Sequence, residues 1–198
     1  MIDYLFEKHN CFKTCYCEGR TSNDGIELYN AYSSLSYVIT AFLILNYKTK
    51  NQVFKYLLAL VLTLLGISSY FSHYYMNNLG NFCDNYSILL VILIFLFYNN
   101  VNIITLFMII IFFVFYSMLK INRLKLTFII LILFNYYISR KARLEKKTNV
   151  LFVAINIILY ISVFVWAYDY IQDEYCVHWI WHILTAILFY LLFIWYSI

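Results

Sequence analysis

The chain has 198 residues, of which 64% are apolar and only 12% are charged, and its formal net charge is +4. Soluble domains are closer to half apolar and a quarter charged, so this composition excludes an ordinary soluble globular domain. The 35 residues from Asn85 to Leu119 contain no charge at all. A bilayer core needs about 20 apolar residues per helix, so this run predicts two spans, joined at Asn99, Asn100 and Asn102.

Residues 1–27 form an N-terminal segment that is expected outside the membrane. Its first ten residues, MIDYLFEKHN, carry acids and a histidine where a cleavable signal peptide needs a basic and then an apolar stretch. The first span is therefore expected to insert itself. Residues 28–198 are expected to form one domain, so the predicted fold is an all-α membrane protein, a bundle of seven transmembrane helices. In chain order the predicted spans are 28–47, 54–74, 84–98, 101–119, 124–139, 149–168 and 177–197.

Seven spans place the two termini on opposite sides of a membrane. Eight basic residues fall on the C-terminal side and six on the other, and five of the eight crowd the loop from Arg140 to Asn149. By the positive-inside rule, the N-terminus is expected in the lumen or outside the cell and the C-terminus in the cytosol. The expected location is an endomembrane (ER or Golgi) or the cell membrane.

The cysteines agree with this orientation, because all five fall on the N-terminal side. Disulfides persist in oxidising compartments, so this restriction indicates a luminal or extracellular face. The alternative is that the cysteines pack as small apolar residues. The odd number leaves at least one unpaired or joined to another molecule. The five are Cys11, Cys15, Cys17, Cys83 and Cys176.

Three histidines are candidates for a metal site. His73 falls at the end of the second span, and His178 and His182 open the seventh. Residues four apart share a helix face, so His178 and His182 can hold one ion. Odd-numbered spans start on the N-terminal side, and even-numbered spans end there. His73, at the end of the second span, is therefore expected at the same membrane depth as His178 and His182. Three protein ligands plus water is the pattern of a catalytic zinc.

Two further polar residues are expected at that depth. Ser69 precedes His73 by one helical turn, and Asp84 opens the third span. A zinc ion lowers the pKa of a bound water to about 7, a carboxylate can take and return protons, and a hydroxyl can donate to a developing oxyanion. Each residue alone also has an ordinary explanation: an interfacial histidine, a packing serine, a helix N-cap. The hypothesis of a site rests on their convergence.

These residues lie in motifs that resemble the alkaline ceramidase family, within the wider superfamily that includes the adiponectin receptors. GISSYFSH at 66–73 is similar to the family's Gly-x-Gly-Ser-x-x-Phe-His, although Ser68 replaces its second glycine and Ser72 its phenylalanine. HWIWH at 178–182 is similar to its His-x-x-x-His. The N-terminal Cys-Glu at 17–18 and IELYNAYS at 26–33 resemble two further segments of the family.

The resemblance implies a zinc-dependent amidase that hydrolyses ceramide to a sphingoid base and a fatty acid. By motif match, His73, His178 and His182 would bind zinc, and Ser69 and Asp84 would contact the zinc-bound water and the substrate carbonyl. The implied partner is a ceramide-like membrane lipid. No nucleic-acid partner is expected, and the sequence identifies no protein partner.

Two further features follow from the resemblance alone. Cys17 and Cys176 match a disulfide-linked pair of the family. The family also binds calcium through its N-terminal segment, and Glu18 and Glu27 match two of those ligands. Here Cys15 replaces an acidic ligand and Arg20 an amide one, and an arginine there would repel calcium. The alternative is that Arg20 pairs with Glu18 or Glu27.

Two other functions stay open from the sequence. The same five residues can hydrolyse another lipid amide or an ester. A lipid-binding receptor with a structural zinc and negligible turnover is the alternative from a different class. A transporter lacks support, because no charged residue falls in the middle of a predicted span and no broken-helix pair is present.

Overall fold

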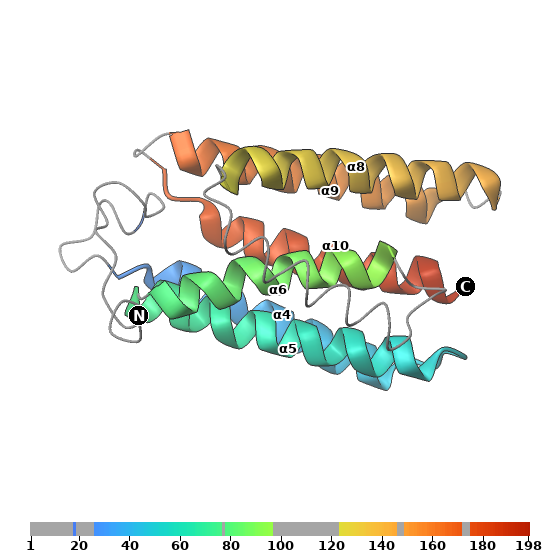
Figure 1. The fold of residues 1–198 in the computed structure, drawn as a ribbon, viewed down its shortest axis with the longest axis horizontal. Coiled ribbons are helices and arrows are strands. Elements are labelled where there is room, and N and C mark those ends of the chain that lie inside the picture. Colours follow the sequence, from blue (N-terminus) through green and yellow to red (C-terminus); the bar gives the residue numbers. More distant parts are fainter. Residues whose placement is uncertain (1–17, 19–25, 77, 97–122, 146–148, 172–174) are drawn as a thin grey trace.

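The computed structural model describes residues 18, 26–76, 78–96, 123–145, 149–171 and 175–198, and Figure 1 shows their arrangement. Six α-helices occur among these residues, and none of them lies in a strand. The expected all-helical class is confirmed for this part of the chain. The helices are α4 (Leu28–Asn46), α5 (Gln52–Tyr75), α6 (Asn78–Leu96), α8 (Arg123–Leu144), α9 (Val150–Ile171) and α10 (His178–Ser197).

Four of these helices are long and apolar enough to cross a membrane. They are α4, α5, the stretch Val150–Asp169 of α9, and α10, with 19 to 24 residues each. A span needs about 20 residues. In α6 the apolar stretch is shorter, from Phe82 to Leu96. The described helices are therefore compatible with an integral membrane protein.

Six of the seven predicted spans coincide with a helix of the structure. The fourth predicted span, 101–119, lies outside the described residues, so the count of seven stays a prediction. The apolar runs locate these six helices, of which four are long and apolar enough to cross a membrane.

Three predicted boundaries are wrong in the same direction, because the helices are longer than the apolar runs. α6 begins at Asn78 and not at Asp84, α8 continues to Leu144 through the basic residues predicted as a loop, and α9 continues past Asp169. Lysine and arginine in a last turn interact favourably with the helix dipole and can extend their charged ends toward water. Hydropathy alone therefore ends such a helix too early.

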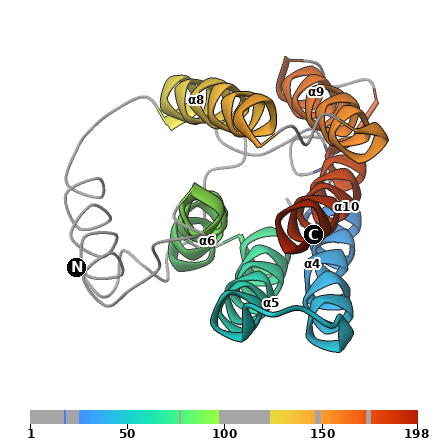
Figure 2. The same ribbon diagram turned by 90° about the vertical axis from the view of Figure 1, so that its right-hand side faces the viewer.

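The helices lie side by side along the long axis of the molecule (Figure 1). Seen end on, they follow one another in the order α6, α5, α4, α10, α9 and α8 (Figure 2). α4 packs against both α5 and α10, and α10 also packs against α9. The starts of α4, α6 and α10 and the end of α5 share one end of the bundle (Figure 1). This end carries the candidate site.

A glycine lets α4 and α5 approach closely next to this end. A Cβ atom added at Gly66 of α5 would lie 2.7 Å from Cγ2 of Val38 and 3.1 Å from the backbone oxygen of Ser34, both on α4. Small residues allow such close packing between membrane helices. Ser69, which follows Gly66 by about one turn, is thereby brought within hydrogen-bonding distance of Ser34, with the two hydroxyl oxygens 2.9 Å apart.

Candidate metal centre

Three histidines meet at the shared end of α5 and α10. His73 lies in the last turn of α5, His178 is the first residue of α10, and His182 follows one turn later. Each offers a ligand nitrogen, and the three atoms lie within 4.8 Å of one another. All three side chains are buried, with 3%, 1% and 0% exposed. The histidines predicted to share one membrane depth therefore lie together and can hold one metal ion.

The ring of His73 is held by a carboxylate from outside its own helix. Glu27, the residue that precedes α4, is 1% exposed, and its Oε2 accepts a hydrogen bond from Nδ1 of His73. The same oxygen accepts a hydrogen bond from the side-chain amide of Asn30 at 3.0 Å. Since Nδ1 of His73 carries the proton, Nε2 is the nitrogen that can bind a metal. A carboxylate on the second nitrogen is the usual support of a metal-binding histidine.

His182 is held in the same way by α4. Its Nδ1 lies 3.0 Å from the backbone oxygen of Asn30, 2.8 Å from Oγ of Ser33 and 3.3 Å from Oγ of Ser34. A carbonyl oxygen only accepts, so Nδ1 of His182 is the donor and Nε2 keeps its lone pair. Among the described residues, this buried Nε2 has no hydrogen-bond partner. Buried polar atoms are normally paired, so the nitrogen fits a metal ligand.

Ser69 and Asp84 lie beside the histidines, as the sequence predicts. Ser69 is fully buried on α5, accepts a hydrogen bond from Oγ of Ser34 at 2.9 Å and is hydrogen bonded to the carboxylate of Asp84. The other carboxylate oxygen, Oδ1 of Asp84, is buried and has no hydrogen-bond partner in the described part of the chain. Since α6 begins at Asn78, Asp84 is its seventh residue, and the alternative role of helix N-cap is wrong.

Asp84 is a neighbour of the ligand set and not a member of it. Within the described residues, the group of ligand atoms closer than 4.8 Å to one another contains the three histidines alone. A structural zinc site normally has four protein ligands, whereas a catalytic site has three and keeps one position for water or substrate. The donor set therefore fits a catalytic metal, whose fourth position would be left for water or substrate.

Glu18 lies at the start of α4 and caps it. Its Oε1 accepts a hydrogen bond from the backbone N–H of Tyr29 at 2.7 Å, and its Oε2 accepts one from that of Asn30 at 3.0 Å. Burial raises the pKa of Glu18 above its ordinary value, although these two bonds act in the opposite direction. Glu18 and Glu27 thus both support the site through Asn30 or His73. Calcium binding at this pair stays a prediction, since Arg20 lies outside the described residues.

The cysteines are only partly within the described chain. Cys83 is a free thiol on α6. Cys176, two residues before α10, is not a free thiol. Cys17 lies outside the described residues, so the bond between Cys17 and Cys176 stays a prediction.

Sequence reasoning missed the supporting residues of α4 and α9. Asn30, Ser33 and Ser34 face His182, and Asp169 accepts hydrogen bonds from the backbone at the start of α10. A signal existed for α4, since polar residues recur at positions 30, 33 and 34 on one face of an otherwise apolar span. For Asp169 the signal was weaker: the seventh span starts without a capping side chain of its own.

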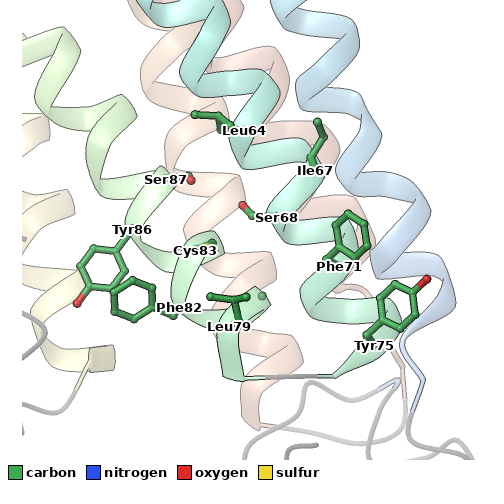
Figure 3. A pocket seen from close by; sticks show the side chains of 11 residues that line it. Leu64, Ile67, Ser68, Phe71, Tyr75, Leu79, Phe82, Cys83, Tyr86 and Ser87 are labelled. Atoms are coloured by element: carbon green, nitrogen blue, oxygen red, sulfur yellow. The ribbon is translucent and has the colours of Figure 1, made fainter. Parts of the chain in front are cut away.

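A pocket of about 640 Å³ lies between α5 and α6 near the site (Figure 3). Its wall is mostly apolar, and Ser68 and Cys83, the sequence neighbours of Ser69 and Asp84, belong to it. Ile67 and Phe71 of its wall are each 45% exposed, so the pocket opens toward the outside of the bundle. It is large enough for part of a small-molecule ligand.

No family model matches the chain, and no curated protein or solved structure matches it either.

Proposed function

We propose that this protein is a zinc-dependent, integral-membrane amidase that hydrolyses the N-acyl bond of a ceramide-like lipid. The observation that carries the proposal is the cluster of His73, His178 and His182, buried at one end of a membrane-type bundle, with Ser69 and Asp84 beside it. Three histidines with an open fourth position favour catalysis over a structural metal. The same feature argues against a receptor with a structural zinc.

Each residue has a role that its position supports. Zinc, when bound, provides a water molecule with a pKa of about 7. His73, His178 and His182 would hold the ion. Asp84 accepts a proton from the attacking water and passes it to the nitrogen of the amide as the carbon–nitrogen bond breaks. Ser69 hydrogen bonds to Asp84. Once Asp84 has taken the proton of the water, the hydroxyl of Ser69 is free to turn and donate to the carbonyl oxygen as this oxygen gains negative charge. The products are a fatty acid and an amine, here a sphingoid base.

The choice of a lipid substrate rests on three considerations. The three histidines lie on α5 and α10, which are long and apolar enough to span a bilayer. A substrate dissolved in the membrane therefore reaches them most directly. The apolar pocket between α5 and α6 offers room for a hydrocarbon chain (Figure 3). The motifs at 66–73 and 178–182 resemble those of the alkaline ceramidases, which specifies the amide of ceramide within the class of lipid amides and esters.

The remaining details of the proposal follow from the resemblance and from the charge distribution. The N-terminal segment is placed in the lumen or outside the cell and the C-terminus in the cytosol. Cys17 and Cys176 are proposed to form a disulfide that holds this segment near the site. Mass spectrometry of unreduced, alkylated protein tests the bond. Free thiols at both positions in protein purified without reductant contradict it.

The experiment that tests the function combines metal analysis with a lipid panel. Full-length protein in detergent or nanodiscs is analysed for zinc and incubated with acyl-labelled ceramide, another N-acyl lipid amide and a phospholipid ester. The proposal expects about one zinc per chain, in keeping with one three-histidine site, and fatty-acid release from ceramide in preference to the ester. Release from the ester alone favours the esterase alternative. Zinc without release from any lipid favours the receptor.

A further inference from the structure

The helix that carries two of the histidines begins without a cap of its own. The first four N–H groups of a helix have no partner inside it, and Val177, the residue before α10, provides no side-chain cap. Asp169 of α9 caps the helix instead. Its Oδ1 accepts hydrogen bonds from the backbone N–H of Val177 at 2.7 Å and from that of His178 at 2.9 Å. Asp169 is fully buried.

These two bonds tie the last turn of α9 to the first turn of α10. A carboxylate at a helix N-terminus interacts favourably with the helix dipole, and a hydrogen bond to an ionised acceptor is stronger than one between neutral groups. Helix ends otherwise fray. Because His178 is the first residue of α10, its backbone is held directly by Asp169.

The two histidines of α10 are therefore positioned from different directions. His182 is held through its ring by α4, where Asn30 and Ser33 contact Nδ1. His178 is held through its backbone by α9. The two rings lie with their centroids 4.7 Å apart. This distance depends on α10 being helical from its first residue, since a frayed turn would move His178 away from His182.

We propose that Asp169 is a positioning residue for the metal centre: by fixing the start of α10, it sets the place of His178 relative to His73 and His182. The proposal rests on the metal site of the proposed function but not on hydrolysis. Contacts that orient a metal ligand typically change metal affinity by about ten- to a hundredfold when removed.

The test compares zinc affinity among full-length variants by competition with a chelator. Asp169→Ala removes the acceptor, and Asp169→Asn keeps an oxygen at the same place without the charge. Ser162→Ala is the matched control, because Ser162 is also buried on α9 but its hydroxyl donates to Ile158 within the same helix. We expect zinc binding about ten- to a hundredfold weaker in Asp169→Ala, an intermediate loss in Asp169→Asn, and wild-type affinity in Ser162→Ala.

Hydrogen exchange of the amides of Val177 and His178 in zinc-free protein gives a second readout. Exchange should be faster in Asp169→Ala and unchanged in Ser162→Ala. Zinc affinity that stays at the wild-type value in Asp169→Ala, despite faster exchange, overturns the proposal, and so does an equal loss in Ser162→Ala. If Asp169→Ala does not fold, Asp169→Asn decides in the same way. If wild-type protein binds zinc but releases no fatty acid, the proposed function is contradicted. The ratio of zinc affinities between wild type and Asp169→Ala can still be measured, so that result does not affect the proposal for Asp169.

Discussion

Glu27 and His73 are joined at two points, although 46 residues separate them in the chain. The backbone N–H of Glu27 donates to the backbone oxygen of His73 at 3.1 Å, and Nδ1 of His73 donates to the carboxylate of Glu27. The first bond fixes the start of α4 against the end of α5. The second fixes the orientation of the ring whose other nitrogen faces the metal site. The contact between α4 and α5 and the orientation of His73 therefore depend on the same residue, Glu27.

Glu27→Gln should weaken zinc binding while leaving the fold in place. The amide keeps the shape and an acceptor oxygen but loses the charge that supports the proton on Nδ1 of His73. A loss of about ten- to a hundredfold in zinc affinity is expected from such a change, measured by chelator competition. Glu145→Gln is the control, because Glu145 pairs with Lys141 at 3.6 Å at the opposite end of the bundle. Equal affinities in the two variants would show that Glu27 does not support the site.

His178→Ala or His182→Ala should each abolish bound zinc and hydrolysis. Two histidines alone hold zinc far more weakly than three, because one more ligand position is left without a protein group. Elemental analysis of purified protein measures the metal, and fatty-acid release measures the activity. His9→Ala serves as a control for the loss of a histidine and should retain zinc. About one zinc retained in both His178→Ala and His182→Ala would show that the ion binds elsewhere.

The sequence predicts the site better than it predicts the surroundings of the site. The sequence could assign the three histidines, Ser69 and Asp84 to one membrane depth, because successive spans cross the membrane in alternating directions. The helical spacing then showed which of these residues share a helix face. Distances across the bundle could not be derived in this way, since they depend on which helices are neighbours. That α4 lies between α5 and α10 became visible only in the structure, and with it the roles of Asn30 and Ser33.

The role of Glu27 shows the same limit. Its motif match suggests a calcium ligand, which stays a prediction, but the contact of its carboxylate with His73 could not be predicted from the sequence. Hydropathy also could not locate the helix ends, because a buried polar residue such as Asp169 resembles a loop residue until its hydrogen-bond partners are known. The apolar runs gave the helices but not the contacts made by the polar residues among them.

Asp84→Asn should retain zinc and lose turnover. The amide keeps the shape of the carboxylate but cannot accept the proton of the attacking water, and general acid–base catalysis typically contributes about a hundred- to ten-thousandfold. Ser69→Ala should be milder, with a loss of roughly ten- to a thousandfold, as for an oxyanion donor. Rates of fatty-acid release at matched zinc content measure both. Near-normal turnover in Asp84→Asn would remove Asp84 from the mechanism.

The two chain ends should be accessible from opposite sides of the membrane. α4 and α10 start at the same end of the bundle and run in the same direction (Figure 1), so Ile198 lies at the far end from Glu27. A tag after Ile198 should be reached by antibody or protease from the cytosol, and a tag before Met1 should be protected until the membrane is opened. The reverse pattern would contradict the orientation and the argument that the cysteines face an oxidising compartment.

Gly66→Ala should destabilise the protein, although helix propensity alone favours alanine over glycine by about 1 kcal/mol. The added Cβ would lie 2.7 Å from Cγ2 of Val38 and within 3.2 Å of backbone atoms of α4. Valine has little rotational freedom and the backbone cannot yield locally, so α4 and α5 must separate.

Overpacking of this kind costs about 1–3 kcal/mol, so the net effect of Gly66→Ala should be a lower melting temperature in detergent. Zinc affinity should fall with it, because separation of α4 from α5 pulls Ser34 from Ser69 and Glu27 from His73. Ser68→Ala is the control, since Ser68 is partly buried on the pocket side of α5 (Figure 3) and makes no contact between α4 and α5 that the structure describes. A melting temperature raised in Gly66→Ala would mean that propensity outweighs packing and that the close approach of α4 and α5 does not hold the metal site together.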